Sequence, residues 1–220
     1  MRKILGLISL FLPWRIRRLW LKRFFGYKLH PKSRIRLSWV FPAHLEMGEG
    51  AVIDNFTLVK HIDTLRMEEH TFIGRLCWIT GSPLSSRELF VGEDRQPMLH
   101  LEKHAEVTSL HHIDCTNKVR IGEYSIVAGY ATQFLTHSVD LEKSEQRSRP
   151  ITIGKYCFIG TNSVILGGSE MADYCVLGAK SLLNKQWTQK YVLLGGVPAK
   201  IVKELSPDMK YFKRKKGTIS

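Results

Sequence analysis

Aliphatic residues recur at every sixth position in the second half of the chain. The repeat falls on Ile153, Ile159, Ile165, Met171, Leu177 and Leu183. A helix repeats near 3.6 residues and a strand near 2, so neither element alone gives a six-residue period. A period this regular predicts a stacked architecture built from one short repeating unit.

A small residue stands two places before most of these aliphatic positions, at Cys157, Ser163, Ser169, Cys175 and Ser181. Positions two apart on an extended chain face the same side. Each hexamer is therefore predicted to be a short strand with a small and a large side chain pointing inward, followed by a turn. Three units close a triangular coil, and stacked coils bury the aliphatic column. Cys77 occupies the same kind of inward position, which predicts buried structural thiols.

The same period occurs upstream, where it restarts at Met47, Met67, Leu101 and Ile121. Together the repeats predict an all-β domain of about six coils over residues 31–185. Strands of an ordinary sandwich are the alternative, but strict alternation does not produce a six-residue period with matched small residues. The longest interruptions are residues 80–100 and 134–152, and loops that leave a rigid scaffold often carry function.

The chain ends differ from this repeat. Residues 1–30 predict a basic amphipathic helical segment, in which WRIRRLWLKRFF places Trp and Phe on one arc and Arg and Lys on the other, with Arg17 as the exception. This composition is typical of helices that lie in a membrane interface. Packing on the β-core or on a neighbouring subunit is the alternative. Residues 186–220 predict a closing segment, with a short C-terminal helix from about Ala199 and a basic tail.

Length and charge narrow the class of protein. The 220 residues suffice for one domain with a sizeable core, and the formal net charge is +13. Much of that charge lies at the two ends, and no nucleic-acid recognition module accompanies it, so no nucleic-acid partner is expected. Four cysteines without a CxxC motif fit a reduced cytoplasmic setting. We expect a cytoplasmic protein, peripheral on the inner face of a membrane through residues 1–25.

Two further motifs carry a resemblance to a known family. They are FLTHSVDLEKSEQRSRPITIG at residues 134–154 and LLGGVPAKIVKEL at residues 193–205. With the hexapeptide repeat, they make residues 31–205 resemble the left-handed β-helix, hexapeptide-repeat acyltransferases, above all the galactoside, maltose and exopolysaccharide O-acetyltransferases. The left-handed crossover is implied by this resemblance alone, since parallel crossovers are usually right-handed.

The resemblance implies a role for specific residues. His137 falls on the family's general base, and acetyl-CoA is the co-substrate, bound in a groove between subunits of a homotrimer. The cofactor-binding positions fall on Thr161, Ala179, Asn184, Lys185, Gly196, Ala199, Lys200 and Lys203. Possible acceptor contacts fall on Thr108, His111 and His112, although His111 departs from the small residue usual at its position. No metal is expected.

The chemistry of these residue types agrees with acetyl transfer. A sugar hydroxyl is a poor nucleophile at neutral pH, and a histidine with a pKa near 6.5 is suited to take its proton. Lys200 and Lys203 offer positive charge for phosphates. No covalent enzyme intermediate is needed, so the cysteines need not be nucleophiles. The predicted function is O-acetylation of a sugar hydroxyl on a surface polysaccharide or a lipid-linked glycan precursor.

Other functions remain open at this point. An N-acetyltransferase acting on an amino sugar, or a serine acetyltransferase, would need the same base. A zinc-dependent, carbonic-anhydrase-like β-helix would need several histidines, and His104, His111, His112 and His137 are available. The GGVPAK ending argues against that alternative. A non-catalytic β-helix scaffold is the third alternative, and the presence of His137 argues against it.

Overall fold

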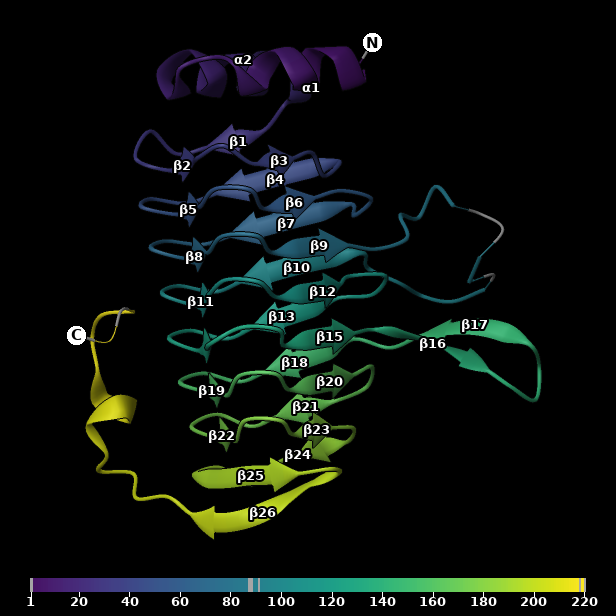
Figure 1. Ribbon diagram of the computed structural model, residues 1–220, viewed down its shortest axis with the longest axis vertical. Coiled ribbons are helices and arrows are strands. Elements are labelled where there is room, and N and C mark those ends of the chain that lie inside the picture. The colour runs from purple at the N-terminus through teal and green to yellow at the C-terminus, as the bar shows by residue number, and fades with distance from the viewer. Residues whose placement is uncertain (1, 87–88, 91, 218, 220) are drawn as a thin grey trace.

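The computed structural model describes residues 2–86, 89–90, 92–217 and 219 of this chain. Short parallel strands stack into a triangular parallel β-helix with three sheets (Figure 1). The first sheet contains β1 (Lys28–Leu29), β4 (His44–Met47), β7 (Thr64–Met67), β10 (Met98–Leu101), β13 (Val119–Ile121), β18 (Ile151–Ile153), β21 (Glu170–Met171) and β24 (Gln186–Trp187). This sheet opens each turn of the coil.

The chain passes from the first sheet to the second and then to the third. The second sheet contains β2 (Arg34–Ile35), β5 (Val52–Ile53), β8 (Phe72–Ile73), β11 (Glu106–Val107), β14 (Ile126–Val127), β19 (Phe158–Ile159), β22 (Val176–Leu177), β25 (Val192–Gly196) and β26 (Ala199–Glu204). The third contains β3 (Trp39–Val40), β6 (Leu58–Val59), β9 (Trp78–Thr80), β12 (His112–Asp114), β15 (Gln133–Leu135), β20 (Val164–Leu166) and β23 (Leu182–Leu183).

Three edges join these sheets, and we number them by the sheet that the chain leaves. The first edge joins the first sheet to the second, the second edge joins the second to the third, and the third edge returns to the first sheet. Seven complete coils and a partial eighth are present in the described residues. The predicted count of about six is short by one, because the aliphatic spacing is six from Leu29 to Ile35 but five from there to Val40.

The predicted inward column is the core. The side chains of Ile153, Ile159, Ile165, Met171, Leu177 and Leu183 are all buried. The four cysteines are also buried and free, and three of them, Cys77, Cys157 and Cys175, stand at the predicted inward positions. Because each coil repeats the same inward pair, the aliphatic column fills the triangle along its whole length.

The C-terminal region departs from the prediction. Residues 199–204 form β26, an antiparallel partner of β25 with Gly196 opposite Ala199, and not the start of a helix. The hairpin covers the hydrogen-bonding edge that the last strand of the second sheet would otherwise expose. Among the described residues that follow, helical structure is limited to a 3₁₀ turn over Lys210–Lys213.

Two helices lie across the N-terminal end of the β-helix, α1 (Arg2–Leu10) and α2 (Trp14–Phe25) (Figure 1). Leu21 and Phe25 are buried against the first coil, as the packing alternative predicts. Arg17 lies on this buried face and donates to the backbone carbonyls of Arg36 and Ser38 at 2.9 and 2.8 Å. The arginine that interrupts the apolar arc therefore binds carbonyl oxygens at the open end of the coil, and burial lowers its pKa to about 10.

Candidate active site

His137 begins a β-hairpin that projects from the third edge of the fifth coil, formed by β16 (His137–Asp140) and β17 (Glu145–Ser148). The hairpin and the insertion that follows β9 project from the same side of the molecule (Figure 1). The Nδ1 atom of His137 lies 2.8 Å from Oδ2 of Asp114. Asp114 ends β12, the strand next to β15 in the third sheet, with Leu135 as its register partner. Coil stacking thus joins two residues that are 23 positions apart in the sequence.

The carboxylate of Asp114 is held by a set of short hydrogen bonds. Besides the imidazole, it accepts from the backbone N–H groups of Thr116, Thr136 and His137 and from both threonine hydroxyls, at 2.6–3.1 Å. Burial opposes its ionisation, but the hydrogen bonds from His137, Thr136 and Thr116 outweigh burial and lower its pKa to about 2. Asp114 is therefore a carboxylate at neutral pH.

This carboxylate sets the state of the histidine. Hydrogen bonding to Asp114 raises the pKa of His137, while partial burial opposes the rise. Because the ionised carboxylate can only accept, Nδ1 carries the proton, and Nε2 of the neutral ring is an acceptor. The His137 side chain is 45% exposed, so a substrate can reach it. The arrangement suits general-base catalysis, in which Nε2 takes a proton and Asp114 stabilises the resulting imidazolium.

The insertion after β9 forms one wall beside this pair. The ring of Phe90 meets the His137 imidazole edge-on, with 6.2 Å between centroids. The guanidinium of Arg95 lies over the Phe90 ring, 4.4 Å from its centroid. Arg95 is buried and donates to the carbonyls of Ser82 and Thr116 at 2.9 and 3.1 Å. The insertion is thus fixed to the coil that carries Asp114.

Glu93 ties the insertion to the hairpin. Its carboxylate accepts from the backbone N–H of Ser148 at 2.9 Å and from the hydroxyl of Ser148 at 2.8 Å. Ser148 is the register partner of His137 across the hairpin. The position of His137 therefore depends on a contact between two loops that are far apart in the sequence.

The predicted cofactor positions fall into two groups. Thr161 and Ala179 follow one another on successive coils at the second edge, and the Ser181 hydroxyl there accepts from the N–H of Gly196 at 3.2 Å. Gly196 and Ala199 face each other across the β25–β26 hairpin, while Lys200 and Lys203 are exposed on β26. These positions share the C-terminal part of the second edge and the hairpin that closes it.

The remaining predicted positions lie at the third edge. Asn184 and Lys185 follow β23 and are exposed, and the amine of Lys185 stands 4.4 Å above the Trp187 ring. His137 lies at this edge as well, whereas Thr161 and Ala179 lie at the second edge. Within one chain, His137 is thus separated from most of the predicted cofactor positions.

The three predicted acceptor contacts lie in two different environments. His111 is completely buried, its Nδ1 accepts from the N–H of Thr132 at 3.2 Å, and its Nε2 lies 2.9 Å from the Thr108 hydroxyl. That hydroxyl also lies 2.7 Å from the carbonyl of Gly129. Both residues bind each other at the second edge, whereas His137 of the same chain lies at the third edge, and burial lowers the pKa of His111 to about 4. His112 remains exposed on the outer face of the third sheet, beside Trp78.

Within the described ranges, no group of three or more His, Cys, Asp or Glu side chains is placed to hold a metal ion. Sequence reasoning missed Asp114, Phe90 and Glu93. The available signal was that Asp114 and Glu93 stand at interruptions of the repeat, where polar residues are not required by the coil.

Comparison with known proteins places these features in context. Residues 150–185 match the family described as bacterial transferase hexapeptide (six repeats). Galactoside O-acetyltransferase of Escherichia coli (strain K12) is 36% identical over 98 residues, covering 43% of this chain and 48% of that protein. Serine acetyltransferase of Buchnera aphidicola subsp. Acyrthosiphon pisum (strain APS) is 28% identical over 172 residues, covering 77% and 62%. The chain thus spans less than two thirds of the length of these relatives.

Among solved structures, the polysialic acid O-acetyltransferase OatWY superposes with a TM-score of 0.60 at 18% identity, covering 81% of this chain and 84% of that one. The fold is therefore the left-handed β-helix of hexapeptide-repeat proteins. The resemblance to hexapeptide-repeat acyltransferases that the sequence predicts is confirmed.

Proposed function

We propose that this protein is an acetyl-CoA-dependent O-acetyltransferase that acts on a sugar hydroxyl of a surface polysaccharide or a lipid-linked glycan precursor. The observation that carries the proposal is the pairing of an accessible His137 with the largely buried carboxylate of Asp114 on a hexapeptide-repeat β-helix. The names of the relatives, O-acetyltransferases of galactosides and of polysialic acid, support a sugar acceptor.

In this mechanism the hydroxyl of the acceptor donates its proton to Nε2 of His137 while its oxygen attacks the thioester carbonyl of acetyl-CoA. The imidazolium that forms is stabilised by Asp114, which remains ionised. Collapse of the tetrahedral intermediate breaks the carbon–sulfur bond, and the proton returns from Nε2 to the departing thiolate. General-base assistance of this kind contributes about 10²–10⁴-fold to the rate.

The donor is proposed to bind along the second edge, where Thr161, Ala179 and the Gly196–Ala199 hairpin present small residues and backbone groups. Lys200 and Lys203 are exposed on the adjoining strand, free to meet phosphates. Since His137 of the same chain lies at the third edge, a complete site requires a second chain. We propose a homotrimer in which the third edge of one subunit meets the second edge of the next, since a contact between two different surfaces can close into a ring with threefold symmetry.

Calorimetric titration of acetyl-CoA, combined with an assay of CoA release in the presence of sugar acceptors, tests this function. The wild type and His137→Ala should both bind acetyl-CoA, and the variant should release CoA roughly 10²–10⁴-fold more slowly. His44→Ala changes another exposed histidine and is the matched control. Failure of the wild type to bind acetyl-CoA, or full activity of His137→Ala, would contradict the proposal.

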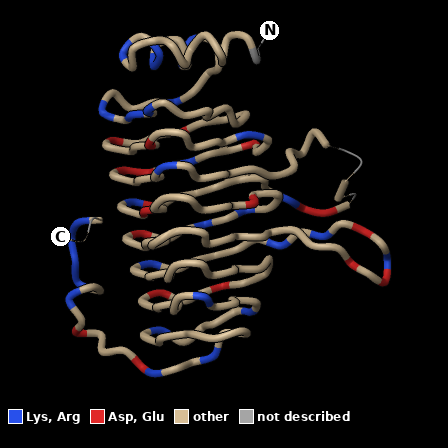
Figure 2. The backbone as a smooth tube through the Cα atoms, in the orientation of Figure 1, with Lys and Arg blue, Asp and Glu red and all other residues tan. Residues whose placement is uncertain are grey.

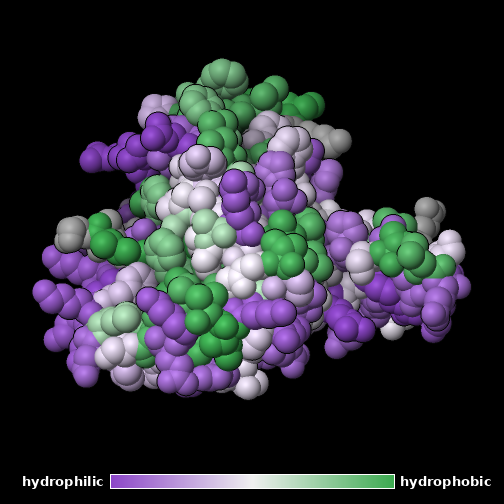
Figure 3. All heavy atoms as spheres, turned by 60° about the horizontal axis from the view of Figure 1, so that its bottom comes forward, coloured by the Kyte–Doolittle hydropathy of each residue, from purple (hydrophilic) through white to green (hydrophobic). Residues whose placement is uncertain are grey.

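We further propose that the protein binds the inner face of a membrane through α1 and α2. Neither helix is long and apolar enough to cross a bilayer, nor is any other helix in the described part of the chain. The exposed large apolar residues of the helical end are Ile4, Leu7, Ile8, Phe11, Ile16, Leu19 and Phe24. In Figure 3 this end is turned away from the viewer, and only apolar residues along the upper margin of the molecule are visible. The two helices carry basic and no acidic residues (Figure 2).

Vesicle flotation tests this docking surface. Wild-type protein should float with vesicles that contain anionic lipid, since each basic residue near such a surface contributes roughly 1 kcal/mol. The double variant Phe11→Ser, Leu19→Ser removes two exposed apolar side chains and should remain in solution. Leu141→Ser, at an exposed leucine of the hairpin, is the control and should float like the wild type. Equal flotation of all three proteins would count against docking through the helices.

A further inference from the structure

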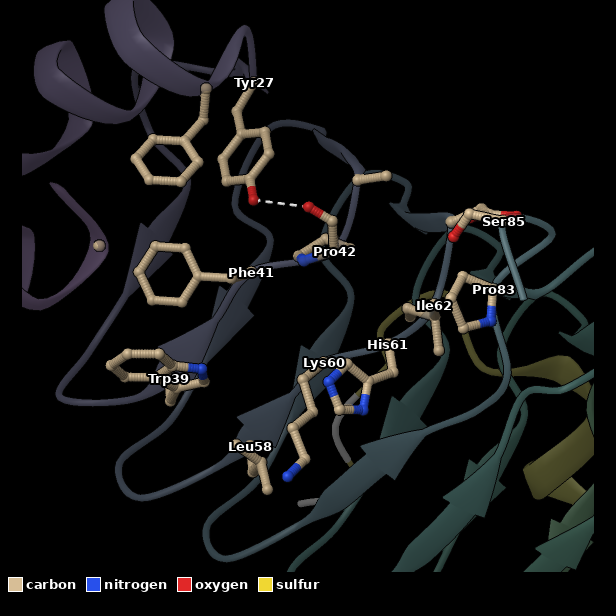
Figure 4. Close-up of a pocket in the computed structure, with 14 residues that line it drawn as sticks. Tyr27, Trp39, Phe41, Pro42, Leu58, Lys60, His61, Ile62, Pro83 and Ser85 are labelled. Carbon is tan, nitrogen blue, oxygen red and sulfur yellow. Dashed lines mark hydrogen bonds between the residues drawn. The ribbon is translucent and has the colours of Figure 1, made fainter. Parts of the chain in front are cut away.

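A cavity of about 650 Å³ lies between the helical end and the third edge of the first two coils. Its size is within the range of sites that hold small organic ligands. Figure 4 shows Tyr27, Phe41 and Trp39 along one wall, with Ile62 and Pro83 on the opposite side. The hydroxyl of Tyr27 donates to the Pro42 carbonyl at 2.7 Å, so the polar end of this ring is already engaged. The aromatic wall therefore suits an apolar ligand.

Polar groups are confined to one part of the cavity, formed by the turn after β6. Lys60 and His61 lie side by side there (Figure 4). The carboxylate of Asp63 also lines the cavity, and its Oδ2 accepts from the backbone N–H of Leu84 at 3.1 Å. Among the described residues, neither the amine of Lys60 nor the ring of His61 forms a hydrogen bond or ion pair. A ligand with an apolar chain and a negatively charged group would match this division.

The cavity is continuous with two other features of the molecule. Gly6 of α1 lines it, and the neighbouring Leu7 is 52% exposed on the apolar surface of that helix. On the other side, Pro83 and Ser85 belong to the insertion whose Phe90 reaches His137. Strands β6 and β15 are three places apart in the third sheet, which corresponds to about 14 Å along the coil axis.

We propose that this cavity binds the apolar chain of a phosphate-bearing membrane lipid that carries the glycan acceptor. The chain would lie against Trp39 and Phe41, and the phosphate would lie beside Lys60 and His61. The sugar would then extend along the third edge toward His137. This inference rests on the proposed function and narrows its acceptor to a lipid-linked glycan. A second copy of this chain is the competing occupant of the same apolar wall.

Calorimetry with farnesyl phosphate, in the absence of acetyl donor, tests the cavity directly. Leu58 lines the cavity from the outer face of β6, so Leu58→Trp fills it without changing the aliphatic core. Val52→Trp is the matched control, since Val52 has the same outward position on β5 of the same coil. The wild type and Val52→Trp should bind farnesyl phosphate alike, and Leu58→Trp should bind it about tenfold more weakly or worse. All three should remain folded in thermal melts.

Lys60→Ala tests the polar end of the cavity. The control is Lys210→Ala, which changes an exposed lysine of the C-terminal 3₁₀ turn. Lys60→Ala should weaken farnesyl phosphate about fivefold, as expected for one exposed ionic contact, and leave farnesol unchanged. Dodecyl phosphate distinguishes a fatty chain from an isoprenoid, and inorganic phosphate tests whether the anion alone suffices. Stronger binding of either phosphate-bearing chain than of inorganic phosphate supports the proposal.

Three results would overturn the lipid cavity. The wild type does not bind either amphiphile, or Leu58→Trp binds like Val52→Trp, or only Leu58→Trp changes the oligomeric state in light scattering. The last result would assign the wall to a subunit contact. Because no step of this experiment involves acetyl transfer, failure of the cavity leaves the proposed catalytic function standing. Failure of the catalytic function would leave the lipid binding intact but would remove the glycan acceptor from the proposal.

Discussion

The first and third edges of the β-helix are built from the same repeat, yet their turns differ in length and in the side chains that they carry. At the first edge the turns are uniform and stack their rings from His70 through His104, Tyr124, Tyr156 and Tyr174 to Tyr191, with successive centroids 4.6–5.5 Å apart. At the third edge the turns vary in length, and two of them leave the coil as the insertion and the hairpin. The turns of the first edge therefore repeat from coil to coil, whereas those of the third edge do not.

The residues of the aromatic stack share a backbone conformation that is unfavourable for large side chains. Each has a positive φ, between 53° and 62°. Non-glycine residues rarely adopt this conformation, and stacking with the rings above and below offsets its cost. The stack stops at Gly50, where a Cβ atom would meet Nδ1 of His70 at 2.5 Å.

The C-terminal segment covers this edge, running back along the side opposite the hairpin (Figure 1). Phe212 is buried edge-on against Tyr174 and Tyr191, and the Arg214 guanidinium stands 5.4 Å from the centre of the Tyr156 ring. The hydroxyl of Tyr211 donates to the Cys157 carbonyl at 2.9 Å. We infer that the first edge stabilises the coil, while the third edge carries the insertion and the hairpin that hold His137.

Phe212→Ala is the strongest test of this division. Loss of a buried ring between two aromatic neighbours should lower the free energy of unfolding by about 3 kcal/mol, while CoA release at a temperature where the variant is folded stays within twofold of wild type. Chemical denaturation and the acceptor assay measure the two quantities. A fall in turnover that matches the loss of His137 would show that the first edge is not merely structural.

Asp114→Asn should affect both stability and rate, because Asp114 belongs to the third edge and also holds several hydrogen bonds of the coil. The depressed pKa of Asp114 gives stability that is present above its unfolded pKa near 3.9 and is lost as pH falls through about 2. The variant should therefore be less stable at pH 7 by about 2 kcal/mol, and the difference should shrink between pH 4 and pH 2 in acid denaturation.

The same variant has a kinetic signature. Asp114 raises the pKa of His137. In the proposed mechanism the unprotonated imidazole is the active form, so wild-type activity should rise with pH through that raised pKa. If His137 acts as proposed, the midpoint of this rise should move to lower pH in Asp114→Asn, and the maximal rate should fall. The pH profile of kcat/KM measures both. An unmoved midpoint would contradict the positioning role of Asp114.

Glu93→Gln tests whether the loops of the third edge act together. Replacing the carboxylate weakens the two hydrogen bonds to Ser148 and so weakens the support of His137. If the activation free energy rises by about 1.4 kcal/mol as a result, kcat falls tenfold. Acetyl-CoA affinity should not change, since the predicted donor positions lie elsewhere. Glu145→Gln, at an exposed hairpin residue, is the control. Equal rates for both variants would uncouple the insertion from the base.

Tyr156→Leu should give the smallest effect. It removes two ring contacts from the stack but keeps apolar volume, so the free energy of unfolding should fall by about 1 kcal/mol, with no change in rate. Calorimetric melting of the variant beside Tyr130→Leu, an exposed tyrosine of the second edge, measures the contribution of the stack. Identical melting temperatures would remove the stack as a source of stability.

The sequence by itself determined the repeating parts of this protein. The six-residue spacing predicted the coils, the inward column from Ile153 to Leu183 and the buried cysteines, because a periodic constraint on packing leaves a periodic record in the chain. The resemblance that it carried also directed attention to His137. These features depend on local spacing, and each unit makes the same demand on its residues.

Only the tertiary structure decided what happens where the repeat is broken. Asp114 meets His137 because stacked coils bring distant residues into register, and Arg17 is buried because the open end of the coil presents unpaired carbonyls. Residues 199–204 form a strand because the last strand of the sheet leaves an edge to be paired. Such contacts join segments that are far apart in the sequence, so no spacing within either segment records them.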